Sequence, residues 1–276
     1  KQLDNGKDFR LRFLWRLFLL LIFGLLNTVF YQGDILNMYA LMGLAILPVC
    51  RLKDKTVLII AVILIIQPYF IGQFIYGLMN PDLLVKDPSW YKYFHLSSLT
   101  QGGDSFLEMV KGNFTNGKIA VYAWSWDKGR FFQAPALFML GMLIGRKGLF
   151  IESDKSIKFW KTVLNISIVV SVFFLFFLDD IINLLKYDYA RKYSGLVLDS
   201  WYNLSLMFVW VSGFILLFKK NFFHRILSKL VPFGRMSLTN YIMQSILGAF
   251  IYYGFSLGLY RYTGATYSLL IGIILF

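Results

Sequence analysis

Two short stretches carry polar side chains that could do chemistry in an otherwise apolar chain. The first is FGRMSLTNYIMQS, residues 233–245, where hydroxyl and amide groups recur within a segment expected to span a membrane. Polar groups cost free energy in hydrocarbon unless they are hydrogen bonded, so their presence here needs a physical reason. The second is GLLNTVFYQGDILNMYALMG, residues 24–43, which places the acid Asp34 between two apolar runs.

The polar side chains of the first stretch share one face if the stretch is helical. At 100° per residue the hydroxyls and amides lie within one arc, and only Thr239 points away. Such a face either hydrogen bonds neighbouring helices or lines a polar cavity. Neutral amides and hydroxyls can bind a polar ligand but are not strong acids or bases. The candidate binding residues are Ser237, Asn240, Tyr241 and Gln244, with Ser245 and Gly248 on the same face.

The start of this helix is predicted from its flanking residues. Pro232 and Gly234 should break the chain, and Ser237 can then cap the new helix.

Asp34 is the candidate catalytic carboxylate, with two interpretations. It can cap the helix that follows, accepting backbone N–H groups and interacting favourably with the helix dipole. Alternatively it faces a cavity and serves as a general base, or orients one. Asn27 and Gln32 lie close to it in the sequence and add hydrogen-bonding capacity, so both are candidate binding residues.

Three further residues outside the apolar runs could take part. His95, in WYKYFHLSS, has a side chain that can act as a base near neutral pH, or is simply solvated. Arg130 precedes an apolar run and either anchors an anionic group or marks the membrane interface. Arg235, with Arg146 and Lys147, could hold the phosphates of a cytosolic cofactor, although the positive-inside rule explains these charges equally well.

Composition predicts the elements that position these residues. The chain has 276 residues, of which 58% are hydrophobic and 16% charged, against about 25% charged in soluble proteins. Apolar runs near the length of a membrane-spanning helix recur along it. We therefore expect an all-α polytopic membrane protein forming a single transmembrane domain over residues 1–276. One cysteine and two histidines exclude Cys-type and three-histidine zinc sites, and we expect no metal.

Eight spans are predicted, separated by one long polar segment. That segment, residues 80–130, is expected on the outer side, and SFLEMVKGNFTNGKIAVYAW within it to form an amphipathic helix at the surface. The start at Lys1 and the apolar end predict that the intact chain continues at both ends with more spans. The spans are expected at roughly 12–31, 35–50, 57–79, 131–150, 160–178, 200–218 and 237–256, and from about 263 onward.

The charge distribution predicts the orientation. The net charge is +13, and with the start of the chain inside, the positive excess falls on the inner segments, as the positive-inside rule requires. The excess of basic residues therefore indicates membrane lipids, and not nucleic acid, as partners. The expected location is the bacterial plasma (inner) membrane, crossed several times, with the start of the chain cytoplasmic.

Three blocks resemble a known family. FLWRLFLLLIFGLLNTVFYQGDILNMYALMGLAILP, FFQAPALFMLGMLIGRKGLF and FGRMSLTNYIMQSIL look like blocks of the YeiB-like membrane proteins, the domain-of-unknown-function 418 family. The resemblance runs from about residue 10 to the end and implies that two or three further spans precede Lys1. This chain has Asn27 where family members often have histidine, so histidine chemistry is not expected at that position.

The resemblance implies a function only indirectly, through the grouping of the family with transmembrane acyltransferases. It implies transfer of an acyl group from a cytosolic thioester, such as acyl-CoA, to an extracytoplasmic glycan or lipid acceptor. A transporter or flippase for a lipid or small solute is the alternative, since polar residues within spans also mark transport pathways. A structural subunit without chemistry is the third possibility.

Overall fold

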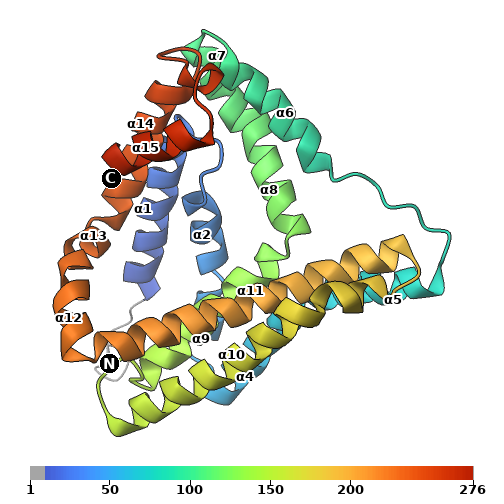
Figure 1. Ribbon diagram of the computed structural model, residues 1–276, viewed down its shortest axis with the longest axis vertical. Coiled ribbons are helices and arrows are strands. Elements are labelled where there is room, and N and C mark those ends of the chain that lie inside the picture. Colours follow the sequence, from blue (N-terminus) through green and yellow to red (C-terminus); the bar gives the residue numbers. More distant parts are fainter. Residues whose placement is uncertain (1–9, 276) are drawn as a thin grey trace. The chain divides into compact units, whose positions relative to one another are not determined.

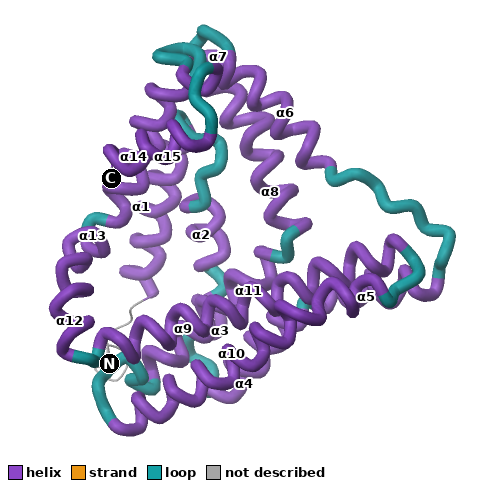
Figure 2. Tube along the Cα trace, viewed as in Figure 1, coloured by secondary structure: helices purple, strands orange, loops and turns teal. Residues whose placement is uncertain are grey.

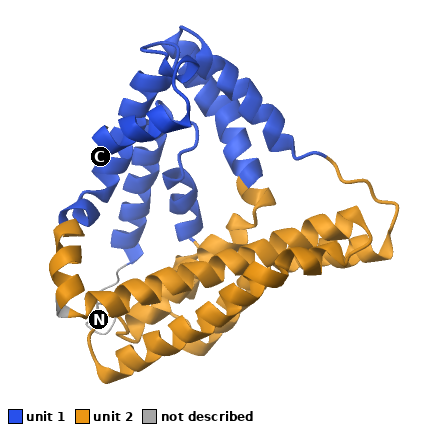
Figure 3. Ribbon diagram, viewed as in Figure 1, with its two compact units in different colours: residues 1–44, 87–124, 232–276 blue, residues 45–86, 125–231 orange. Residues whose placement is uncertain are grey.

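The computed structural model describes residues 10–275, and helices are the only regular secondary structure in that range (Figures 1 and 2). The all-α prediction is confirmed. The helices form two compact units (Figure 3). Unit 1 comprises residues 1–44, 87–124 and 232–276, and unit 2 comprises residues 45–86 and 125–231.

Unit 1 contains the ends of the chain and most of the long polar segment. In it α1 packs against α2 and α14, while α6 packs against α7 and the π-helical turn η1. Its helices are α1 (Arg10–Thr28), α2 (Leu36–Gly43), α6 (Ser89–Gly102), α7 (Phe106–Gly112), η1 (Asn113–Gly117), α8 (Lys118–Asp127, ending in unit 2), α13 (Val231–Arg235, beginning in unit 2), α14 (Ser237–Tyr252), η3 (Leu259–Arg261) and α15 (Ala265–Leu275).

The segment expected to lie at the surface as an amphipathic helix is helical, but one of its faces is buried. Met109, Asn113 and Ala120 are fully buried. The Asn113 side-chain amide donates to the carbonyls of Thr28 and Val29, both at 3.2 Å. A π turn inserts an extra residue into a helix and changes the direction of the side chains beyond it. Here η1 precedes Lys118, the first residue of α8.

Unit 2 contains the longest helices. In it α11 packs against α10 and α5, and α4 packs against α9. The hydroxyls of Ser171 and Ser205 lie 2.7 Å apart between α10 and α11, a small-residue contact of the kind that lets membrane helices approach closely. The helices are α3 (Ile46–Val49), α4 (Asp54–Ile66), α5 (Pro68–Met79), α9 (Arg130–Arg146), α10 (Asp154–Asn183), α11 (Asp188–Phe218), α12 (Asn221–Leu227) and η2 (Ser228–Leu230).

The third predicted span is broken at Gln67, between α4 and α5. Gln67 has φ 58°, in the left-handed region, and Pro68 begins α5. Proline lacks an N–H donor and disfavours helical geometry in the preceding residue, so the helix breaks there. The Gln67 amide donates to the Ser200 hydroxyl at 2.6 Å, and the indole of Trp201 donates to the Ile65 carbonyl at 2.9 Å.

Within residues 10–275, four helical segments are long and apolar enough to cross a membrane. They are Arg10–Thr28, Asp54–Met79, Asp154–Asn183 and Asp188–Phe218, and large apolar side chains such as Val169 remain exposed on them. Such exposure is expected of a surface that faces lipid. The predicted count of eight is not confirmed. Residues 35–50 form two short helices, and Ala265–Ile274 is a shorter apolar helix.

The predicted cap of α14 is wrong. Pro232 and Gly234 lie within α13, and α14 begins after Met236, which occupies the N-cap position without a side-chain hydrogen bond. Proline is tolerated in the first turn of a helix, where its missing donor has no partner to lose. Ser237 is therefore the first residue inside α14 and not its cap.

Candidate functional site

Asp34 lies in the turn between α1 and α2 and is 1% exposed. Its Oδ2 accepts the backbone N–H of Asn37 at 3.1 Å, so it satisfies one of the free donors in the first turn of α2. Asp34 therefore contacts a backbone donor at the helix start, but the predicted N-cap position is wrong, because Ile35 and not Asp34 occupies it. This backbone contact involves only Oδ2, so Oδ1 of the carboxylate is left for other partners.

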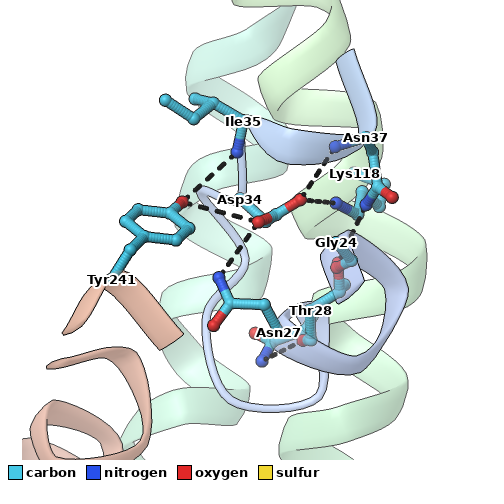
Figure 4. A network of polar contacts seen from close by, with 9 residues as sticks. Gly24, Asn27, Thr28, Asp34, Ile35, Asn37, Lys118 and Tyr241 are labelled. Atoms are coloured by element: carbon cyan, nitrogen blue, oxygen red, sulfur yellow. Dashed lines mark hydrogen bonds and ion pairs between the residues drawn. The ribbon is translucent and has the colours of Figure 1, made fainter. Parts of the chain in front are cut away.

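Three side chains from different parts of unit 1 complete the surroundings of Asp34 (Figure 4). The Asn27 amide of α1 donates to Oδ1 at 3.0 Å. The Tyr241 hydroxyl of α14 lies 3.5 Å from the same oxygen, and the Lys118 Nζ of α8 lies 3.8 Å from Oδ2. These residues, with Thr28 and Asn37, are called the Asp34 cluster below.

The cluster depends on a close approach between α1 and the start of α2. The Thr28 hydroxyl donates to the Gly24 carbonyl at 2.7 Å, and the Asn37 amide donates to the Thr28 hydroxyl at 3.2 Å. A Cβ at Gly24 would lie 2.6 Å from Asn37 Oδ1 and 2.8 Å from the Asn37 nitrogen. Only glycine fits this crossing, and it therefore sets the distance at which Asn27 reaches Asp34.

Among residues 10–275, Lys118 is the only basic residue whose side chain pairs with the Asp34 carboxylate. Its side chain is 13% exposed. Burial lowers the pKa of Lys118, and the adjacent negative charge of Asp34 opposes that shift. Because desolvation prevails, the lysine is less firmly protonated than a surface lysine.

Several buried polar atoms of unit 1 have no hydrogen-bond partner within residues 10–275. Gln32 Oε1 and Ser97 Oγ approach the same point, since a Cβ at Gly117 would lie 3.1 and 3.2 Å from them. Buried polar groups are normally paired, so we expect these atoms to bond water or a bound molecule. The atoms are Asn27 Oδ1, Gln32 Oε1, Asn37 Oδ1, Trp90 Nε1, Ser97 Oγ and Lys118 Nζ, the last of which retains its ion pair with Asp34.

An open pocket of about 320 Å³ lies along α14, and Tyr241 is one of its lining residues. The Tyr241 hydroxyl accepts the Ile35 backbone N–H at 3.4 Å and lies 3.5 Å from Asp34. Tyr241 thus belongs to both the Asp34 cluster and the pocket wall. The pocket is lined by Tyr31, Tyr241, Gln244, Ser245, Gly248, Ala249, Tyr252 and Tyr253.

The structure brings together only some of the residues that the sequence singled out. Asn27 and Tyr241 both contact Asp34, and Gln244 lines the pocket together with Tyr241. Ser237 is exposed and Asn240 half-buried, and neither lines the pocket. Of the polar face predicted for this helix, only the part from Tyr241 onward therefore lines the pocket.

The three charged or titratable candidates lie outside the Asp34 cluster. His95 is exposed on α6, and Arg235 is exposed at the end of α13. Arg130 begins α9 in unit 2. Arg146, considered for phosphate binding, instead bonds the carbonyls of Cys50 and Leu52 and pairs with Asp54 at 3.0 Å.

Sequence reasoning missed Lys118 and Asn113. Both lie in the long polar segment, where charged and amide side chains are expected to be solvated. One signal was present: Asn113 and Gly117 are four residues apart, on one face of a helix, and Lys118 opens the apolar run IAVYAW. A lysine next to such a run needs a partner when the run is buried.

Residues 144–276 match the family model "Protein of unknown function (DUF418)". A relative from Bacillus subtilis (strain 168), the uncharacterized protein YxaH, is 26% identical over 272 residues, covering 93% of this chain and 63% of the relative. The chain thus spans less than two thirds of that relative's length. No solved structure matches.

Proposed function

Since residues 144–276 match the model of the DUF418 family of proteins of unknown function, we propose that this chain is a membrane acyltransferase and that Tyr241 and Asp34 handle the acceptor proton. The acyl donor is a cytosolic thioester such as acyl-CoA, and the acceptor is a hydroxyl on an extracytoplasmic glycan or lipid. Its location is the bacterial plasma membrane, with the start of the chain cytoplasmic.

One observation carries the proposal: a buried carboxylate reaches an open pocket through a single hydroxyl. Asp34 is 1% exposed and does not line the pocket, whereas Tyr241 contacts both. The 3.5 Å contact exceeds the usual length of an O–H···O bond. Catalytic hydrogen bonds are often long without substrate and shorten when it binds. Tyr241 is therefore the catalytic residue, and Asp34 acts through it.

The chemistry that this arrangement supports is proton removal from an alcohol. The acceptor oxygen attacks the thioester carbonyl, forming a C–O bond, and the C–S bond breaks. The acceptor proton passes to the Tyr241 oxygen while the Tyr241 proton passes to Asp34. That proton then returns to the leaving thiolate, so an ester and a thiol are formed without net change in charge. Asn27 and Lys118 hold the carboxylate in place.

The proposal is tested with the purified full-length protein in liposomes that contain its own membrane lipid extract. Radiolabelled acetyl-CoA is added, and thiol release and labelled lipid or glycan are measured. Tyr241→Phe should abolish transfer, whereas Tyr262→Phe, at a residue 79% exposed, should not. Asp34→Asn should change the pH profile of the rate and not only its size. Full transfer by Tyr241→Phe would overturn the proposed role.

A transporter or flippase is the second candidate, and the buried Asp34–Lys118 pair favours it. Paired charges inside helical membrane proteins often mark substrate or proton pathways. The same liposomes distinguish the two functions if a fluorescent lipid is placed in one leaflet. Lipid movement without thioester cleavage, lost in Lys118→Met, would favour transport over acyl transfer.

A further inference from the structure

The wall of the pocket beside Tyr241 has a distinctive composition. Four of its eight lining residues are tyrosines, and the remainder are a glutamine, a serine, a glycine and an alanine. None of these eight side chains carries a charge at neutral pH. Its volume of about 320 Å³ lies at the small end of the range of ligand pockets.

The polar groups of the wall suit a ligand with several hydroxyls. The Ser245 hydroxyl donates to the Tyr241 carbonyl at 3.1 Å, and the Tyr252 hydroxyl lies 3.4 Å from the Ser268 carbonyl. The Gln244 side chain is exposed and makes no hydrogen bond within the described part of the chain. Its amide can both donate and accept, as neighbouring hydroxyls on a ring require.

Charge argues against an anionic ligand. Within residues 10–275 no lysine or arginine lines the pocket, and Asp34 lies 3.5 Å from the Tyr241 hydroxyl. A phosphate or carboxylate would meet no cation in the wall and would approach a negative group. A cation gains little, because Lys118 already faces the Asp34 carboxylate. Burial of any charge without a partner is costly, so the wall selects an uncharged molecule.

We propose that this pocket binds an uncharged, hydroxyl-bearing ring, as in a neutral sugar, with one hydroxyl presented to Tyr241. The apolar C–H faces of such a ring pack on tyrosine rings, whose hydroxyl ends remain available for hydrogen bonds. Gly248 and Ala249 leave room for the ring on the surface of α14. The inference rests on the proposed function, since the bound ring supplies the acceptor hydroxyl.

Binding without any thioester tests this inference separately from acyl transfer. The full-length protein in nanodiscs is given diacylglycerol, glucosyl diacylglycerol or phosphatidylglycerol with identical acyl chains, and bound lipid is counted by native mass spectrometry. We expect about tenfold tighter binding of the glucosyl lipid than of either other lipid. Equal binding of all three, or preference for phosphatidylglycerol, would overturn the inference.

Free glucose distinguishes the source of the ring. Competition by glucose with the glucosyl lipid indicates that the ring alone is recognised. Binding of the lipid without such competition indicates a lipid head group. Either outcome supports an uncharged ring. Sugar binding without acyl transfer would retain the pocket assignment and reject the acyltransferase, so the two failures are distinguishable.

Gly248→Leu is the matched blocking variant. A Cβ at Gly248 would meet nothing within 4 Å, and leucine is a better helix former than glycine, so the fold should tolerate it. Its side chain fills the pocket, and we expect about tenfold weaker binding of the glucosyl lipid. Gly272→Leu is the control, because a Cβ at Gly272 would also meet nothing within 4 Å and Gly272 does not line the pocket.

Gln244→Leu is a second pocket variant, which should weaken binding without blocking the pocket. Unchanged binding in both pocket variants would contradict the assignment.

Discussion

Replacing Asp34 with asparagine should destabilise the protein severely, and the contacts give the reason. The Oδ1 position faces the Asn27 amide, and the Oδ2 position faces the Asn37 N–H and the Lys118 ammonium. Whichever way the new amide turns, its NH₂ group meets a donor. Lys118 also loses the carboxylate that compensates its burial.

The expected magnitude follows from the burial of the pair. Removing one partner of a buried ion pair costs about 3–5 kcal/mol, because the other charge stays buried and unpaired. For a chain of this size, 1 kcal/mol shifts Tm by about 2–4 °C, so Asp34→Asn should lower Tm by roughly 6–20 °C. Lys118→Met should cost less, because Asp34 retains its other donors. The double variant should be more stable than additivity predicts, by about 1 kcal/mol or more.

Thermal unfolding of the purified protein in one detergent, followed by size-exclusion chromatography after heating, measures these shifts. Asp82→Asn is the control, because Asp82 is an exposed carboxylate outside the cluster. The reasoning is refuted if Asp34→Asn shifts Tm no more than Asp82→Asn. It also fails if the Asp34 and Lys118 substitutions are additive, since the two charges would then not compensate each other.

Four further outcomes are expected from the same contacts. Burial lowers the pKa of Lys118 below 10.5, so the unfolded chain binds more protons between the two pKa values. Stability from this group therefore rises with pH through that window, and Lys118→Met should flatten the slope in pH-dependent unfolding. Gly254→Ala should destabilise by about 1–3 kcal/mol, because its Cβ would lie 2.4 Å from the Gly102 carbonyl oxygen. Gly248→Ala, whose Cβ would meet no neighbour, should be neutral or stabilising, and equal Tm values for the two alanine variants would contradict the expected difference. Ser200→Ala should cost about 1–3 kcal/mol in thermal unfolding, because it leaves the buried Gln67 amide unpaired.

The residues near Asp34 show how much of the fold and of the candidate site the sequence predicts. The all-α class follows from composition, and the contact between Asn27 and Asp34 follows from their proximity in the sequence, since only seven positions separate them. The helical projection of 237–248 correctly groups Tyr241 with Gln244, Ser245 and Gly248, because 3.6-residue periodicity fixes which side chains share a face.

What the sequence could not supply is long-range packing. Lys118 reaches Asp34 from 84 positions away in the numbering because η1 and α8 pack against the turn after α1. No local pattern encodes that contact. The break at Gln67 was also missed, although Pro68 follows it, because the hydropathy of residues 54–79 is continuous across the proline.

The break at Gln67 implies an order in which the contacts of α4 and α5 form during biosynthesis. The helices α4 and α5 have 13 and 12 residues, so each alone is about 20 Å long or less at 1.5 Å per residue and cannot cross a bilayer core of about 30 Å. They must therefore enter the membrane as one segment. At that time the Ile65 carbonyl and the Gln67 amide lack Trp201 and Ser200, which are translated more than a hundred residues later. Newly inserted α4–α5 should thus stay beside the translocation machinery, or keep water at the break, until α11 arrives.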